Sequence, residues 1–256
     1  MRYLIKLAYD GSAFHGWQIQ SNAHTVQAEM EQKLSLFFGE KVSVTGCGRT
    51  DTGVHARNFY AHFDLKKELP FSSKDLIYKL NRFFDDSIAI YQLQRVPDDF
   101  HARFSAISRT YRYYLHQIKN PFLTRYSYYF PGNLDLISMN KAAEILMKYR
   151  DFTSFSKLHT QTATNICHVT EAFWKEHENG KLIFTITADR FLRNMVRAVV
   201  GTLMEIGKGK IKPEAIQTII EAKERQKAGY SVPAHGLFLE EILYDPAVMN
   251  PYKVNG

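Results

Sequence analysis

Long apolar runs and a set of cysteines that could form disulfides are both missing from this 256-residue sequence. No stretch of about 18 apolar residues occurs, and the first ten residues carry charges at Arg2, Lys6 and Asp10, so neither membrane insertion nor secretion is expected. The two cysteines, Cys47 and Cys167, lie far apart and lack metal-ligand spacing. This usage fits a reducing compartment better than a disulfide scaffold, and the cytoplasm is the expected location.

Patterns for metal ions and for nucleotide cofactors are absent from the sequence as well. His55 and His62 are separated by a turn and strand and do not match a zinc pattern. No glycine fingerprint for phosphate or dinucleotide binding follows the first expected strand. The sequence therefore predicts neither a metal centre nor a nucleotide cofactor.

The sequence does have apolar content for a substantial core and an uneven distribution of positive charge. Hydrophobic residues make up 45% of the chain, which is enough for one large domain or two small ones. The net charge is +7, and two basic blocks carry the excess: residues 101–130 contain five basic and no acidic residues, and residues 190–212 contain six basic residues and Glu205. Such a distribution favours a polyanionic partner, although two unrelated solvated faces would produce the same pattern.

Hydrophobic periodicity predicts two halves with the same order of elements. In the first half, Thr25 is placed to begin a helix and Gly39 to end it. The other elements expected there are strands at 2–9, 41–46, 57–65 and 87–95 and a helix at 73–84. In the second half we expect strands at 107–118, 165–177, 181–188 and 236–244, and helices at 135–148, 192–206 and 213–225.

This order is β-α-β-β-α-β in each half, with one additional helix in the second, and it is typical of the ferredoxin-like arrangement. The sequence therefore predicts an α+β protein with two ferredoxin-like halves, residues 1–100 and 101–256. Each half would have an antiparallel sheet with helices on one face, and the active-site cleft would lie between the halves. A proline and two acids at 97–100 mark the expected linker.

The most unusual stretch is Gly-Cys-Gly-Arg-Thr-Asp-Thr-Gly-Val-His-Ala at residues 46–56. Three glycines in eight residues permit positive φ and close approach of another backbone, which favours a ligand-binding loop. Arg49 and Asp51 stand two residues apart, so an extended backbone would point both side chains the same way and the guanidinium would keep the carboxylate ionised. That arrangement is suited to an anionic nucleophile. A loop salt bridge with ordinary turn glycines is the alternative.

The strand expected at 107–118 combines arginines with tyrosines. Alternation would put Arg109, Tyr111 and Tyr113 on one face and Arg112, Tyr114 and His116 on the other. Flat rings among cations can stack on unpaired bases and neutralise phosphates. The alternative is a half-buried strand with tyrosines in the core and arginines along an edge.

Residues 48–56 closely resemble the active-site motif of the tRNA pseudouridine synthases of the TruA type, which implies that Asp51 is the catalytic nucleophile. Further segments resemble the same family in the same order, so the resemblance covers nearly the whole chain: 14–18, 25–27, 109–113, 191–197 and 236–239. Two positions depart from the family pattern. Thr52 stands where alanine is usual, and Ala234 stands where a second proline usually follows Pro233.

The resemblance implies roles for three further residues: Arg197 would pair with Asp51, and Tyr111 and Leu237 would contact the target base. Arg49 is also expected to bind substrate. Contacts with the RNA backbone are expected from Arg109, Arg112 and Arg193. Without the resemblance, Arg193 and Arg197 read as surface residues one helical turn apart.

The implied reaction is isomerisation of uridine to pseudouridine in the anticodon arm of tRNA, at positions 38 to 40, without a cofactor. The resemblance also implies a homodimer whose two chains contact one tRNA. A non-catalytic RNA-binding protein with two ferredoxin-like modules is the main rival, although no RNP-type aromatic signature is found. Weaker rivals are a hydrolase built on Asp51 and His55, and a Cys47–His55 nucleophile and base.

Overall fold

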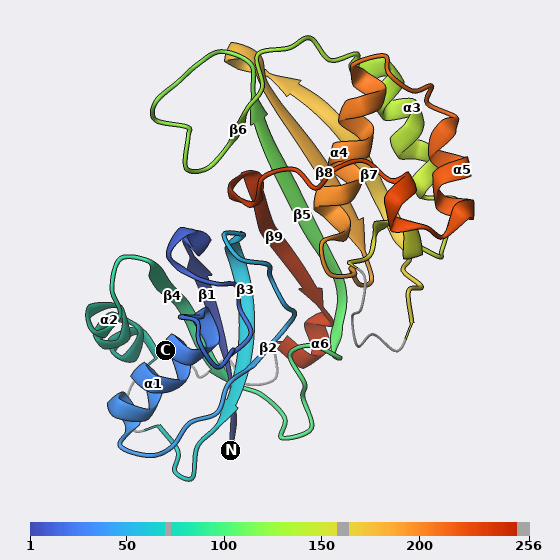
Figure 1. The fold of residues 1–256 in the computed structure, drawn as a ribbon. Coiled ribbons are helices and arrows are strands. Elements are labelled where there is room, and N and C mark those ends of the chain that lie inside the picture. Colours follow the sequence, from blue (N-terminus) through green and yellow to red (C-terminus); the bar gives the residue numbers. More distant parts are fainter. Residues whose placement is uncertain (70–72, 158–163, 250–256) are drawn as a thin grey trace. The chain divides into compact units, whose positions relative to one another are not determined.

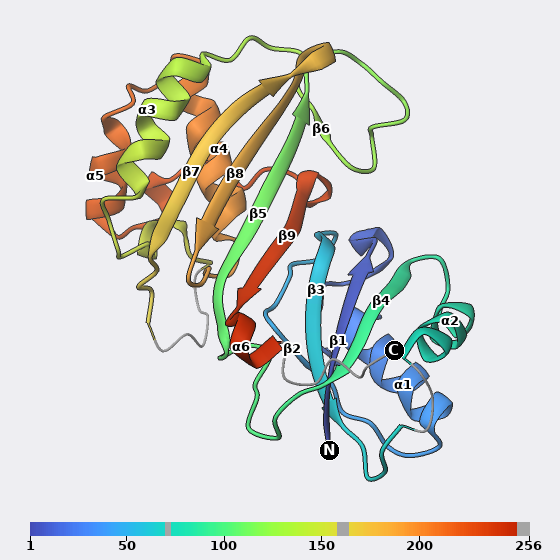
Figure 2. The ribbon, with the colours of Figure 1, turned by 180° about the vertical axis from the view of Figure 1, so that it is seen from behind.

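The computed structural model describes residues 1–69, 73–157 and 164–249, and the chain divides into two compact units (Figures 1 and 2). The first unit contains Met1–Ile107 and Leu239–Gly256, and the second contains Ser108–Phe238. The sequence predicts one boundary, between residues 100 and 101. The observed division differs because the last residues of the chain belong to the first unit. In both units the strands are mostly antiparallel and helices pack beside them, so the predicted α+β class is confirmed.

The sheet of the first unit is centred on β1 (Arg2–Tyr9). This strand pairs antiparallel with β3 (His55–Asp64) on one side and with β4 (Ile88–Arg95) on the other. The last strand, β9 (Leu237–Tyr244), belongs to this unit from Leu239 onward, and Asn58 in β3 donates from Nδ2 to the carbonyl oxygen of Glu240 at 2.6 Å.

Helix α1 (Val26–Phe38) begins and ends where the sequence predicts. The Thr25 hydroxyl accepts from the Ala28 amide at 3.3 Å, and Gly39 ends the helix at φ 68°. Helix α2 (Ser73–Phe83) packs beside α1, with the rings of Phe37 and Phe83 5.8 Å apart. The last helix, α6 (Pro246–Met249), is a short turn near the end of the chain.

The strand predicted at 41–46 is wrong for most of its length, since only β2 (Thr45–Gly46) pairs with β3. Side chains of α1 take the backbone groups that a ladder would have used. Ser35 Oγ accepts from the Val42 amide and Glu31 Oε1 accepts from the Val44 amide, both at 2.9 Å. With these donors satisfied by side chains, the segment runs against α1 instead of forming a longer strand.

The second unit has three antiparallel strands in the order β5-β8-β7: β5 (Ala106–His116), β8 (Lys181–Ala188) and β7 (Val169–His177). The two-residue β6 (Tyr128–Tyr129) runs parallel to the end of β5. Figures 1 and 2 show three helices gathered beside β7 and β8: α3 (Leu136–Leu146), α4 (Met195–Gly207) and α5 (Ala215–Ala222).

Helix α4 begins three residues later than predicted, because Asn194 has left-handed backbone angles, φ 67°. Its side chain donates from Nδ2 to Ser231 Oγ at 2.6 Å, and this tertiary contact holds the residue outside the helix. The apolar side chains of Val196, Val199, Val200 and Leu203 are buried along this helix. In the described part of the chain, no helix has the length and apolar character needed to cross a membrane.

Candidate active site

Backbone hydrogen bonds join the loop that carries Asp51 to the first loop of the chain. The Trp17 amide donates to the Thr50 carbonyl oxygen at 3.3 Å, and the Gly53 amide donates to the Phe14 carbonyl oxygen at 3.3 Å. These two bonds fix the backbone on both sides of Asp51, whose side chain is half-buried. The aspartate is therefore presented on a restrained loop, as positioning of a reactive group requires.

Glycine at position 16 lets the two loops touch. Gly16 has φ +85°, and a Cβ there would lie 2.4 Å from the Thr50 carbonyl oxygen. The close approach predicted for Gly46 is also internal, because a Cβ there would lie 2.6 Å from the Trp17 ring. At these two positions, glycine is required by contacts within the protein and not by a ligand.

The predicted pairing of Arg49 with Asp51 is wrong. Arg49 is exposed and donates from Nε to Oε1 of Gln18 at 3.1 Å, and within the described residues no ion pair joins it to Asp51. Gln18 is held in turn by Gln27, since Gln18 Nε2 donates to Gln27 Oε1 at 2.8 Å. Arg49 is thus oriented by a neutral amide, and its charge remains directed to the surface.

The side chain of His55 is buried and makes contacts within the protein. It is 1% exposed, its Nδ1 accepts from the Gly11 amide at 3.0 Å, and the same nitrogen lies 3.1 Å from Asp10 Oδ1. Cys47 is fully buried and accepts from the Tyr60 amide at 3.4 Å. These contacts give both residues a structural role in holding the loop, so neither the hydrolase nor the cysteine alternative gains support.

Strand β5 alternates as the sequence predicts, with Tyr111 and Tyr113 on its buried face. Tyr111 is 8% exposed and Tyr113 is fully buried, whereas Arg112 between them is exposed. The ring of Tyr111 meets that of Phe191 edge to face at 5.0 Å. Burial raises the pKa of Tyr113 far above its usual range, and its hydroxyl donates to the Pro233 carbonyl oxygen at 3.0 Å.

Arg197 is anchored by the segment that precedes β9. Its Nε donates to the Val232 carbonyl oxygen at 2.7 Å, and the Val232 amide donates back to the Arg197 carbonyl oxygen at 3.2 Å. Arg225 supports the same segment by donating to the Gly229 carbonyl oxygen at 3.0 Å and to Ser231 Oγ at 2.9 Å. The guanidinium of Arg197 is therefore half-buried in a fixed orientation.

The other predicted residues of the second unit differ in exposure. Leu237 is 5% exposed, and the preceding Gly236 lies so close to Tyr113 that a Cβ there would come within 2.8 Å of its ring. Arg109 donates from Nη1 to the Asp189 carbonyl oxygen at 2.6 Å, whereas Arg112 and Arg193 are exposed. The exposed arginines are accessible to a polyanion.

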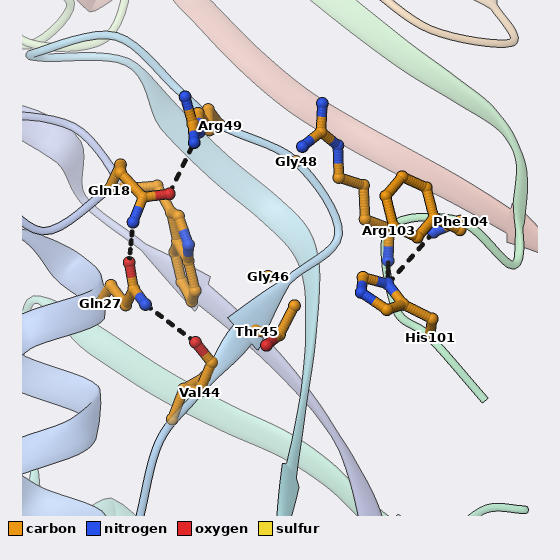
Figure 3. A pocket seen from close by; sticks show the side chains of 11 residues that line it. Gln18, Gln27, Val44, Thr45, Gly46, Gly48, Arg49, His101, Arg103 and Phe104 are labelled. Carbon is orange, nitrogen blue, oxygen red and sulfur yellow. Dashed lines mark hydrogen bonds between the residues drawn. The ribbon is translucent and has the colours of Figure 1, made fainter. Parts of the chain in front are cut away.

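A pocket of about 230 Å³ that no sequence pattern predicted lies beside Arg49 in the first unit (Figure 3). Its far wall is made by His101, Arg103 and Phe104, which lie just after the predicted linker. The available signal was the run of cations and aromatic residues at 101–104. Over the described residues, no three His, Cys, Asp or Glu side chains come together as they would to hold a metal ion.

The wall of this pocket depends on a buried neutral histidine. The Ala102 amide donates to Nδ1 of His62 at 3.1 Å, and His62 is 6% exposed. Burial, with added repulsion from Arg2 and His101, lowers the pKa of His62 from 6.5 to about 4, against a small opposing effect of Asp64. The folded protein therefore keeps this imidazole neutral.

We expect stability to fall as the pH drops from 7 to 5. In that range His62 becomes protonated in the unfolded chain, whereas in the folded protein it stays neutral until about pH 4. The free energy of unfolding should therefore decrease by about 1–2 kcal/mol through this residue. His62→Asn keeps an acceptor for Ala102 but cannot titrate. Urea midpoints at pH 7 and pH 5 should therefore diverge less for the variant than for the wild type, and an equal divergence would contradict the assignment.

Comparisons with known proteins agree with the predicted resemblance. A profile of the family described as tRNA pseudouridine synthase matches residues 142–245. The tRNA pseudouridine synthase A of Parabacteroides distasonis is 49% identical over 246 residues, 95% of this chain and 96% of that protein. The protein of the same name from Bacteroides thetaiotaomicron is 50% identical over 95% of this chain and 90% of its own length, and that of Bacillus subtilis is 39% identical over 96% and 100%. The chain therefore belongs to the tRNA pseudouridine synthase A family.

Proposed function

We propose that this chain converts uridine to pseudouridine at positions 38 to 40 of the anticodon arm of tRNA, with Asp51 as the covalent nucleophile. As a family member the chain is an isomerase that acts on uridine in tRNA. The observation that carries the assignment of Asp51 is the restraint of its loop: backbone bonds from Trp17 and to Phe14 hold the aspartate from both sides. Such restraint suits a residue that must attack one atom of a bound nucleotide.

The proposed reaction breaks one bond of the nucleotide and makes another. Asp51 attacks the nucleotide and forms a covalent bond to it, and the bond between the base nitrogen and the sugar breaks. The uracil turns within the active site, and a carbon–carbon bond forms from C5 to the sugar. The bond to Asp51 breaks and returns the free carboxylate, and the C5 proton leaves while the released ring nitrogen gains a proton. The product has the same composition as the substrate, so the balance requires no oxidant or cofactor.

In this proposal, residues of the second unit pair with Asp51 and contact the target base. Arg197 pairs with Asp51, and its orientation is set because its Nε donates to the Val232 carbonyl oxygen. Tyr111 and Leu237 contact the target base. These roles require residues 1–100 and 101–256 to act as two ferredoxin-like halves around one cleft, and the element order in each half supports that arrangement.

Binding of tRNA is assigned to the arginines and to the two basic blocks. Arg49, Arg112 and Arg193 are exposed, and Arg109 is half-buried, so their charges are placed to neutralise phosphates. A target uridine inside a stem must be extruded before reaction, and these cations can replace contacts that its neighbours lose.

Binding of tRNA is expected to weaken steeply as salt is added. Each phosphate neutralised by the protein contributes about −0.7 to −0.9 to the slope of log K against log salt concentration, so several contacts should give a slope of several units. Titrations of labelled tRNA at increasing potassium chloride concentrations measure it. A flat profile would remove the assignment of the basic blocks to RNA.

A homodimer whose two chains contact one tRNA is also proposed, in the cytoplasm. One basic surface of a 29.7 kDa chain is small beside an L-shaped RNA, which supports a second copy. Sedimentation at assay concentration should show a dimer, and a fully active monomer would overturn the proposal.

The state of the two cysteines supports the proposed location in the cytoplasm. Cys47 and Cys167 are both buried, and burial raises the pKa of the Cys167 thiol to about 12, so neither is suited to redox chemistry.

Release of tritium from tRNA labelled at C5 of uridine tests the function as a whole. Only a synthase removes that proton, so the wild-type protein should release tritium without breaking the RNA chain. A binding protein would leave the label in place, and a hydrolase would cleave its substrate instead. Absence of release from a tRNA that the protein binds tightly would exclude the proposed activity.

A further inference from the structure

The pocket beside Arg49 has a far wall, at residues 101–104, that the proposed function does not use. Figure 3 shows Gln18, Gln27 and Arg49 along one side and His101, Arg103 and Phe104 along the other. Asp51 is not among the residues that line it. At about 230 Å³ it lies below the range of roughly 300–1,000 Å³ typical of pockets for drug-sized ligands, so it suits one small group.

The charge of the pocket favours an anion. Arg49 and Arg103 are both exposed, and no aspartate or glutamate is among its lining residues. His101 adds no charge at neutral pH, because burial lowers the pKa of its imidazole, and its Nδ1 accepts from the Arg103 amide at 3.1 Å. Two guanidinium groups therefore define the charge, and guanidinium matches the geometry of phosphate.

The guanidinium of Arg49 is oriented by a chain of side-chain hydrogen bonds. Gln18 accepts from Arg49 Nε at 3.1 Å and donates to Gln27 Oε1 at 2.8 Å. Gln27 Nε2 donates to the Val44 carbonyl oxygen at 2.9 Å and to Glu31 Oε1 at 3.1 Å. Because Gln27 holds Gln18 and Gln18 holds Arg49 Nε, the orientation of the Arg49 guanidinium is fixed. The side chain is exposed, so the other guanidinium nitrogens are accessible to a ligand.

The opposite wall presents an aromatic ring to solvent from a rigid backbone. Phe104 is 75% exposed, and its ring lies 4.3 Å from that of His101. The backbone beneath is fixed at Ala102, whose amide donates to His62 at 3.1 Å and whose carbonyl oxygen accepts from the Tyr244 hydroxyl at 2.6 Å. The Arg103 guanidinium lies over the Phe104 ring, 5.6 Å from its centroid, and most of the ring remains exposed as a flat surface on which a base can stack.

We propose that this pocket binds one unpaired nucleotide of the tRNA other than the target uridine, with its phosphate at Arg49 and Arg103 and its base stacked on Phe104. The inference rests on the proposed function for the identity of the ligand as substrate RNA. Stacking is tolerant of base identity because every base has a flat face, so the pocket positions the RNA and does not read its sequence.

Affinity for an anticodon stem–loop RNA tests the aromatic wall. Phe104→Leu keeps an apolar side chain but removes the stacking surface, so the dissociation constant measured by fluorescence anisotropy should rise about 5- to 50-fold. Tyr78→Leu is the matched control, since Tyr78 is 63% exposed on α2 in the same unit and does not line the pocket. Equal affinities for the two variants would overturn the proposal.

The salt dependence of the same binding tests the phosphate contact. Arg103→Gln should reduce the slope of log K against log salt concentration by about 0.7 to 0.9, whereas Phe104→Leu should leave the slope unchanged. Arg82→Gln, an exposed arginine on α2, should change neither affinity nor slope by a comparable amount. An Arg103→Gln slope equal to that of the wild type would contradict the assignment.

Tritium release separates failure of this inference from failure of the proposed function. Phe104→Leu should raise the tRNA concentration that gives half the maximal rate of tritium release, whereas Tyr78→Leu should leave that concentration unchanged. If the wild type releases none, the proposed function fails whatever the affinities show. If the wild type releases tritium and the pocket variants bind as the controls do, only the pocket assignment fails.

Discussion

Replacing Asp51 with asparagine is expected to lower the rate of tritium release from tRNA by about 10⁴-fold or more, the scale on which losing a nucleophile acts in other enzymes. The affinity for tRNA should stay within a few-fold of the wild type. Asparagine keeps the shape of the side chain, and the backbone bonds from Trp17 and to Phe14 do not involve the carboxylate. Single-turnover release and anisotropy binding measure the two quantities separately.

Asp86 provides the matched control for that substitution. It is an exposed aspartate of the same unit, in the turn before β4, and Asp86→Asn removes the same charge away from the candidate site. The control should keep the wild-type rate. A rate near that of the wild type for Asp51→Asn would exclude the aspartate as nucleophile.

The second large effect is expected at Arg197. Methionine keeps the bulk of the side chain but removes the cation that we propose pairs with Asp51. The rate of tritium release should therefore fall by roughly 10²-fold at pH 8 if the loss resembles that of other electrostatic partners. Rates of tritium release at pH 6 and pH 8 measure the effect.

Two further observations separate this role from a structural one. Arg197→Met also removes the hydrogen bond to the Val232 carbonyl oxygen, so its melting temperature must be compared with that of the wild type. Lysine restores the charge without the planar donors and should recover only part of the rate. A fully active Arg197→Met protein with an unchanged pH profile would make the arginine an ordinary surface residue.

Local signals in the sequence were sufficient for the elements that are stabilised locally. Helix α1 has its cap at Thr25, its stop at Gly39 and a buried stripe between them, and all three can be read without tertiary information. The strand expected at 41–46 failed because Ser35 and Glu31 of α1 bind its backbone amides. The alternation of residues within 41–46 does not indicate those partners.

The candidate site divides in the same way. The motif predicted a ligand-binding loop around Asp51, but it did not predict the partner of Arg49, because Gln18 lies 31 residues earlier in the chain. The pocket wall at 101–104 depends on His62 and Tyr244, which are 40 and 142 residues away from Ala102. Contacts of this range are set by the fold and have no local signal.

The central claim is that Asp51 drives isomerisation of uridines at positions 38 to 40, and one experiment tests it most directly. Tritium release is measured from a tRNA labelled at C5 of its uridines and from a matched tRNA with cytidine at those three positions. The wild type should release tritium from the first RNA alone, and Asp51→Asn should release it from neither. Release by Asp51→Asn at the wild-type rate, or equal release from both RNAs by the wild type, would contradict the account.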